Sequence, residues 1–150
     1  MTGRAVLRPS FGLALGETAR KVGQLHRRAL AERGADFPSW MLLTLLSQRT
    51  SPVPVEDLVE DLERRMDLPR TDSLSLLQRA VDAGLVVQVP DAPMPTVALT
   101  AAGSAYFADL YAHARAVTDA ASTDLAPAEV EATIDALLAV DARAASLLEH

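Results

Sequence analysis

The 150-residue chain has the size and composition of one globular domain, with 49% hydrophobic and 23% charged residues. It contains no cysteine, which excludes disulfides, thiol redox chemistry and thiolate zinc sites, and which fits an intracellular setting. No apolar run approaches the roughly 20 residues that span a bilayer, and no secretory pattern is present. We therefore expect a cytoplasmic protein without membrane contact.

The charge is unevenly distributed along the chain, although the net charge is only -6. Residues 1–50 carry eight basic and three acidic side chains, residues 51–100 carry four and nine, and residues 101–150 carry two and eight. Surfaces that bind duplex DNA are normally basic, because neutralising phosphates releases counterions and supplies most of the non-specific affinity. The middle of the chain is therefore poor in charges that bind phosphate.

The first half of the chain predicts three helices. Apolar residues recur every three or four positions between residues 13 and 31, with basic residues on the other face. Pro38 suits the first turn of a second helix, PSWMLLTLLSQ, which is apolar on nearly all sides and should be buried. The segment TSPVP has the composition of a linker. A third, amphipathic helix follows in VEDLVEDLERRM, and its acids favour a solvated helix start over a metal or catalytic cluster.

The second half predicts a helix, a hairpin and two further helices. The turn DLPRTD ends the third helix, Thr71 or Asp72 can cap the fourth, and Gly84 ends it. VVQV and TVALT are short β-branched runs separated by PDAPMP, which predicts a two-stranded hairpin with three prolines at its tip. Thr100 begins a long helix and Pro127 opens the last one. The predicted fold class is therefore mainly α.

This order of elements resembles the MarR family of winged helix-turn-helix regulators. Five segments in the family's order carry the resemblance: PSWMLLTLL, VEDLVEDL, LLQRAVDAGLV, VALTAAG and LAPAEVEATIDALL. It implies one domain over residues 1–150, with a two-stranded β wing in a winged helix-turn-helix core at residues 36–103. It also implies N- and C-terminal dimerisation helices at residues 10–34 and 104–148, whose homodimer spaces two winged units for successive major grooves.

Three departures from the family pattern weaken the expected contact with DNA. The third helix is about one turn longer than is usual, because ERRM precedes the turn. Ser75 stands where many relatives have an exposed Arg or Lys. The wing tip PDAPMP lacks the arginines that relatives generally place in the minor groove.

The fourth helix and the residues before it nevertheless hold side chains that suit DNA readout. Gln can read adenine and Arg can read guanine, each with roughly 1–3 kcal/mol of discrimination, although an ordinary polar helix face is the alternative interpretation. Asp72, Asp82 and Asp91 lie near the expected phosphate path, so duplex affinity should be modest or absent. The candidate DNA contacts are Arg64, Arg65, Arg70, Thr71, Ser73, Ser75, Gln78 and Arg79.

The resemblance also implies a pocket for aromatic acids between the dimerisation helices and the winged unit. The residues expected to line it are Arg20, His26 and Trp40, with Tyr111 as a more distant candidate. The basic first helix offers a counter-charge for a carboxylate, and Trp40 offers a stacking face. The alternatives are that Trp40 belongs to the core and that His26 is a satisfied interfacial histidine.

No catalytic site, metal site or cofactor is predicted. His26 and His113 have no neighbouring ligand pattern, and no nucleophile elbow, H-E-x-x-H motif or Gly-rich phosphate loop is present. Two functions remain. The first is a ligand-responsive transcriptional regulator that binds a pseudo-palindromic operator as a homodimer. The second, favoured by the acidic middle third and the proline-rich wing, is a protein that kept the fold but lost duplex binding. It would bind a small molecule or a protein or, as the weaker case, act as an enzyme.

Overall fold

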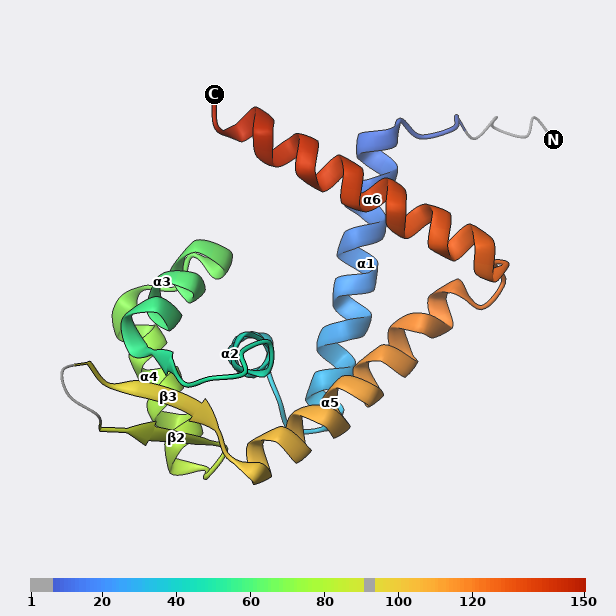
Figure 1. Cartoon of the computed structure of the whole chain (residues 1–150). Coiled ribbons are helices and arrows are strands. Elements are labelled where there is room, and N and C mark those ends of the chain that lie inside the picture. Colours follow the sequence, from blue (N-terminus) through green and yellow to red (C-terminus); the bar gives the residue numbers. More distant parts are fainter. Residues whose placement is uncertain (1–6, 91–93) are drawn as a thin grey trace.

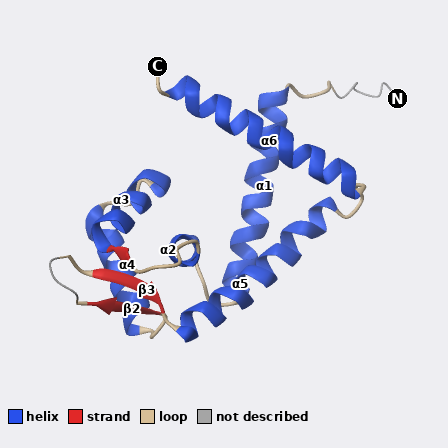
Figure 2. Ribbon diagram, in the orientation of Figure 1, coloured by secondary structure: helices blue, strands red, loops and turns tan. Residues whose placement is uncertain are grey.

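The computed structural model describes residues 7–90 and 94–150, which form six α-helices, one 3₁₀ turn and three short strands (Figure 1). The helices are α1 (Phe11–Glu32), α2 (Phe37–Ser47), α3 (Val55–Met66), α4 (Arg70–Asp82), α5 (Ala101–Asp119) and α6 (Pro127–Leu148). The strands are β1 (Val53–Pro54), β2 (Val86–Val89) and β3 (Thr96–Leu99), and the 3₁₀ turn is η1 (Ala120–Ser122). The predicted mainly helical fold with a β wing is confirmed (Figure 2).

Two glycines end helices by adopting the left-handed conformation. Gly34 follows α1 with φ of 72°, and Gly84 follows α4 with φ of 76°, where other residues would be strained. In each case the next amide reaches back to a carbonyl in the last turn. Ala35 N–H donates to Leu30 over 2.9 Å, and Leu85 N–H donates to Ala80 over 3.0 Å. The prediction that Gly84 ends the fourth helix is confirmed.

The starts of α2 and α4 differ in how they are capped. The Asp36 carboxylate accepts the Ser39 amide at 2.9 Å, and Pro38 lies in the first turn of α2 as predicted. By contrast, α4 begins at Arg70 and has no side-chain cap. The prediction that Thr71 or Asp72 caps it is wrong, because both residues are already helical and Pro69 precedes the first turn.

The sheet has three antiparallel strands in the order β1-β3-β2. β2 and β3 form the predicted wing hairpin, with Val86 opposite Leu99. The segment predicted as a linker contributes the third strand, because Val53 pairs with Val97 along the remaining edge of β3. Val53 is buried by this pairing, so TSPVP is part of the winged core.

Two clusters of buried side chains share helix α2. Leu42, Leu45 and Leu46 face a core built with α3, α4 and the three strands. Leu43 faces the other side, toward α1 and α5. Helix α2 therefore joins the winged unit, which consists of α3, α4 and the three strands, to the α1–α5 pair. The second core consists of Ala29, Leu30, Leu43, Leu110 and Ala114.

The start of α5 is fixed directly to the turn between α4 and β2. The Thr100 hydroxyl accepts the Gly103 amide at 2.9 Å and donates to the Gly84 carbonyl at 2.6 Å. The Thr100 amide donates to the Leu85 carbonyl at 3.0 Å. A Cβ atom on Gly103 would lie 1.9 Å from that same Leu85 oxygen, so only glycine allows this close approach.

Helix α6 crosses α1 away from the winged unit (Figure 1). Within Pro127–Leu148, all of which is described, no residue is buried in the single chain. Its apolar side chains are therefore open to a partner. Among the described helices, none has the length and apolarity needed to cross a membrane.

Candidate nucleic-acid interface and ligand pocket

Helix α4 has one buried and one exposed face. Ser73, Leu76 and Leu77 are buried and fix the helix to the winged core. The opposite side carries hydroxyl, amide and carboxylate groups that point into solvent, and such groups can reach base edges in a major groove. This exposed stripe, with spacings of four, three and four residues, consists of Thr71, Ser75, Gln78 and Asp82.

Ser73 is not part of the exposed stripe, so its prediction as a DNA contact is wrong. Its side chain is 0% exposed, and its hydroxyl donates to the Leu68 carbonyl at 3.5 Å. The position lies on the same side of α4 as Leu76 and Leu77. Because serine is polar, its residue type did not indicate that position 73 belongs to the core.

Gln78 is exposed as predicted, but its amide has a partner within the helix. Its Nε2 donates to Asp82 Oδ1 at 2.9 Å, a contact between residues one turn apart. Bidentate readout of adenine needs this nitrogen as a donor. One of the two N–H groups of the Gln78 amide is therefore already directed at Asp82.

Arg70, at the start of α4, is paired with α3. Its two terminal nitrogens bind both Glu56 carboxylate oxygens at 2.6 Å each. The hydrogen bond from Arg70 lowers the pKa of Glu56, and the same contact raises the pKa of Arg70. Both groups are therefore ionised at neutral pH, and the charge of Arg70 is neutralised by its neighbour.

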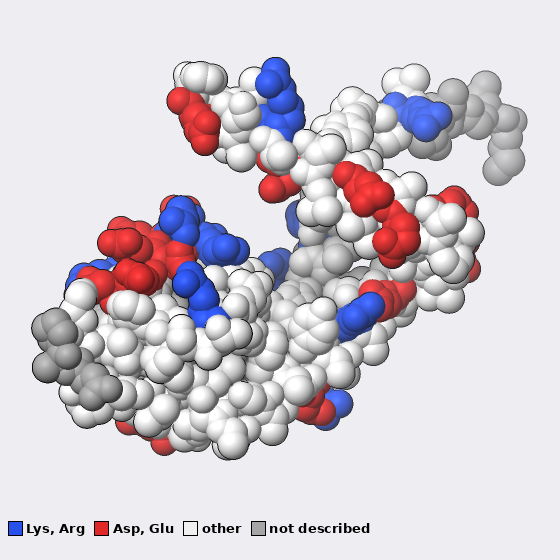
Figure 3. Space-filling view, in the orientation of Figure 1, with Lys and Arg blue, Asp and Glu red and all other residues white. Residues whose placement is uncertain are grey.

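The acidic side chains of α3 pair with two more arginines. Asp61 binds Arg64 of the same helix and lies 3.5 Å from Arg49. Figure 3 shows acidic side chains gathered over α3, with basic groups beside them. The charge of Arg64, a predicted DNA contact, is therefore partly neutralised by Asp61. The acids of α3 are Glu56, Asp57, Glu60, Asp61 and Glu63.

Arg65 and Arg79 have no carboxylate within ion-pair distance in the part of the chain that the structure describes. Arg79 nevertheless lies near the start of α2. Burial favours a higher pKa for Asp36, but hydrogen bonds from Ser39 and the charge of Arg79 outweigh it and lower this pKa. Arg65 and Arg79 are thus the predicted cations that are most available to phosphate.

The wing adds no cation to this surface. The sequence has no Lys or Arg between residues 80 and 114. Val87 and Met94 are exposed on the wing. Asp91, predicted to lie near the phosphate path, is outside the described residues. Contact with DNA would therefore depend on α4 and the end of α3.

A pocket of about 320 Å³ is lined mainly by α5, with one residue each from α1, α2 and α6. It brings together three of the four residues predicted to line a ligand pocket. Trp40 and Tyr111 stack with their rings 6.0 Å apart and nearly parallel, at 6°. His26 meets Trp40 edge-on at 4.9 Å. Trp40 is half-buried, so it both packs against the second core and lines the pocket.

The imidazole of His26 is partly buried against these rings. Burial lowers its pKa below the ordinary value, and the nearby charge of Arg27 lowers it further. His26 is therefore neutral at pH 7, so one ring nitrogen can accept a hydrogen bond and the other can donate one.

Arg20, the fourth predicted residue, does not line this pocket. It lies six residues before His26, which places it on a different face of α1. Arg115 supplies the positive charge instead, and it pairs with Asp119 at 3.3 Å. The signal was present in the sequence, because Arg115 follows Tyr111 by four residues and so shares its face of α5.

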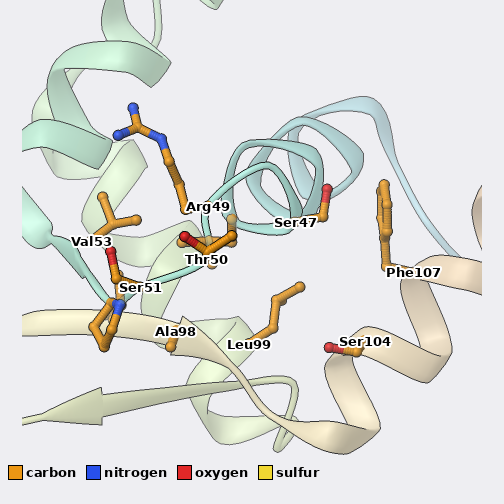
Figure 4. Close-up of a pocket in the computed structure, with 12 residues that line it drawn as sticks. Ser47, Arg49, Thr50, Ser51, Val53, Ala98, Leu99, Ser104 and Phe107 are labelled. Atoms are coloured by element: carbon orange, nitrogen blue, oxygen red, sulfur yellow. The ribbon is translucent and has the colours of Figure 1, made fainter.

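A second pocket of about 390 Å³ lies between the end of α2, the segment at residues 49–53, β3 and the start of α5 (Figure 4). Hydroxyl groups of Ser47, Thr50 and Ser104 line it, while Arg49 points toward α3. Phe107 lines this pocket and also contacts Trp40, with ring centres 5.4 Å apart. The two pockets are therefore neighbours across one aromatic cluster.

No metal centre emerges from the described residues, where no three His, Cys, Asp or Glu side chains are grouped as metal ligands would be. His113 instead contacts Glu32, with Nε2 and Oε2 2.8 Å apart, which links α5 to α1.

An apolar surface extends over α6 and α1. A shallow groove of about 540 Å³ is bordered by Leu15 of α1 and by the exposed aliphatic side of α6. Ile134 and Leu138 are 44% and 63% exposed in the single chain. Exposed apolar surface of this kind is a candidate interaction site.

Comparison with known proteins gives structural relatives but no close sequence relative. No sequence-family profile and no curated protein matches the chain. A MarR family protein from Bacillus stearothermophilus superposes with a TM-score of 0.75 at 17% identity, over 89% of this chain and 92% of that one. A MarR family protein of Mycobacterium tuberculosis in complex with p-aminosalicylic acid gives 0.73 at 22% identity, over 89% and 99%. A MarR family transcriptional regulator from Rhodococcus sp. RHA1 gives 0.68 at 20% identity, over 89% and 96%.

These superpositions extend over nearly the whole length of each protein, so they include the terminal helices as well as the winged unit. Together with the three-stranded sheet and the position of α4, they settle the architecture. The chain has the winged helix-turn-helix fold of the MarR family regulators.

Proposed function

We propose that this protein is a ligand-responsive transcriptional regulator that binds a pseudo-palindromic DNA operator as a homodimer. The exposed stripe of α4 is the observation that carries the proposal. Thr71, Ser75 and Gln78 present hydrogen-bonding groups from a helix whose other face is fixed in the core. A helix held in this way can enter a major groove and read base edges. The proposed role is regulatory rather than catalytic, as in the Rhodococcus regulator of the same fold.

The apolar surface of α1 and α6 supports the homodimer. Two copies of a self-complementary surface form a closed, two-fold symmetric pair. Such a pair carries two α4 helices, which matches an operator with two half-sites about one helical turn, or a multiple of it, apart.

The aromatic pocket supports a ligand of the aromatic acid class. Trp40 and Tyr111 offer flat faces, and a ligand carboxylate can take the place of Asp119 on Arg115. The mycobacterial structure of the same fold contains p-aminosalicylic acid. Trp40 is the only tryptophan of the chain, so quenching of its fluorescence by aromatic acids tests this part of the proposal.

The second candidate function, a protein of this fold that has lost duplex binding, is favoured by the charges around α4. Three of the five arginines at residues 36–103 are paired with acids of α3, and the wing supplies no cation. Such a protein would still bind a small molecule or a protein partner.

Arg79→Ala should weaken binding of a duplex at low salt by roughly tenfold, because a charge-assisted hydrogen bond is worth about 1.5–3 kcal/mol. Arg28→Ala is the control. It removes the same charge from α1, which is not proposed to contact the duplex, and it should leave the affinity nearly unchanged. Fluorescence anisotropy with a labelled duplex measures both variants. Equal affinity of Arg79→Ala and the parent would contradict the predicted contact of Arg79 with the duplex.

A further inference from the structure

The contact between Glu56 and Arg70 joins the first turns of α3 and α4. Each residue uses both of its terminal atoms, at 2.6 Å, across 14 positions of sequence. A guanidinium binds carboxylate and phosphate with the same two-pronged geometry. Glu56 therefore occupies the atoms with which Arg70 would bind a phosphate.

The pair is accessible to an incoming duplex. The side chains of Arg70 and Glu56 are 54% and 45% exposed, so no core packing protects the contact. An exposed ion pair adds little to the stability of a fold. The larger effect of this ion pair is on the surface charge, because it neutralises a cation at the start of α4. The N-terminal end of a recognition helix is the end that approaches the bases.

We propose that Glu56 acts as an internal competitor for phosphate, which holds Arg70 and limits the affinity of the winged unit for duplex DNA. This inference rests on the proposed role of α4 at the duplex. A phosphate binds Arg70 only after Glu56 releases it, and the released carboxylate then repels the same phosphate. Glu56 thus weakens binding in two ways, and Arg70→Ala should cost less affinity than Arg79→Ala.

The test is Glu56→Gln in the full-length chain, with a labelled duplex of mixed sequence at several low salt concentrations. The substitution keeps the length of the side chain and removes its charge. Affinity should rise by roughly tenfold for each protomer that contacts the duplex, as the charged contact of Arg70 is transferred to phosphate. The slope of log affinity against log salt should steepen by about one per protomer, because one more phosphate is neutralised.

Asp57→Asn is the matched control. Asp57 lies in the same turn of α3 and has no ion-pair partner among the described residues. The Asp57→Asn substitution removes an identical charge without releasing Arg70, so the gain in duplex affinity should be much smaller. Adding Arg70→Ala to Glu56→Gln should abolish most of the gain, which assigns the effect to the pair.

Equal gains from Glu56→Gln and Asp57→Asn would overturn the inference, because a general change of charge would then explain them. The absence of any gain, including the absence of duplex binding by both proteins, would also overturn it. A duplex of mixed sequence needs no operator, so the proposed function is judged separately. An operator that the parent recognises, without a gain in Glu56→Gln, contradicts the inference alone. A gain in Glu56→Gln, without any operator for the parent, contradicts the proposed function alone.

Discussion

Gly103→Ala should strongly destabilise the protein. The new methyl group would lie 1.9 Å from the Leu85 carbonyl oxygen and 2.9 Å from its carbon, and neither backbone atom can rotate away. Relief requires that α5 move from the turn between α4 and β2, which breaks the bond from the Thr100 amide to the same oxygen. We expect a loss of roughly 3 kcal/mol or more, in the range of overpacked and strained sites.

This result would oppose the ordinary effect of the substitution, because Gly→Ala within a helix normally stabilises by up to about 1 kcal/mol. Gly23→Ala in α1 is the matched control, since its methyl group would lie 3.6 Å from the nearest atom, on the flexible side chain of Arg27. Urea unfolding should give an unchanged or raised midpoint for Gly23→Ala and a strongly lowered one for Gly103→Ala. Similar midpoints would show that α5 does not depend on this contact.

The double substitution Ile134→Asp and Leu138→Asp should convert the protein to monomers. Both side chains lie on the apolar surface of α6, and a buried carboxylate without a partner costs several kcal/mol. The fold of the single chain should persist, because α6 contributes no buried residue to it. The mass measured by light scattering should fall from twice the 16.0 kDa chain mass to the chain mass itself. Duplex affinity should fall as well, because the two half-sites are then bound independently.

Ala132→Asp with Ala139→Asp is the matched control for this surface. It introduces the same two charges on the opposite side of α6, at positions that are also exposed. This variant should remain dimeric. A parent protein with a mass of 16.0 kDa, or a double variant of Ile134 and Leu138 that stays dimeric, would contradict the proposed interface.

The sequence predicted those features that depend on neighbouring residues. Pro38, Gly84 and Thr100 act at helix ends through their own conformation or through contacts within a few positions, so their residue types were sufficient. The Asp36 cap is equally local, but it was not among the predictions. The strand at Val53 could not be predicted in this way, because its partner Val97 is distant in sequence and the pairing depends on the free edge of β3.

The candidate site was predicted less completely for the same reason. The pairing of Arg70 with Glu56 depends on how α3 and α4 are packed, and neither sequence segment indicates it alone. Ser73 has a polar side chain, but its hydroxyl can be buried because it donates to the Leu68 carbonyl, which the preceding turn places nearby. Arg20 differs from these cases, because the helical period already placed it on another face from His26.

A selection from random duplex DNA at low salt, with the full-length chain, tests sequence-specific recognition by the proposed dimer. Recognition by two α4 helices predicts enrichment of a palindrome whose half-site centres lie about 10 base pairs, or a multiple of that, apart. The enriched positions should coincide with bases that Gln78 and Arg79 can read, namely adenine and guanine. A final pool without a shared sequence, obtained with protein that is folded and dimeric, would contradict recognition by α4 and favour a protein of this fold that no longer reads DNA.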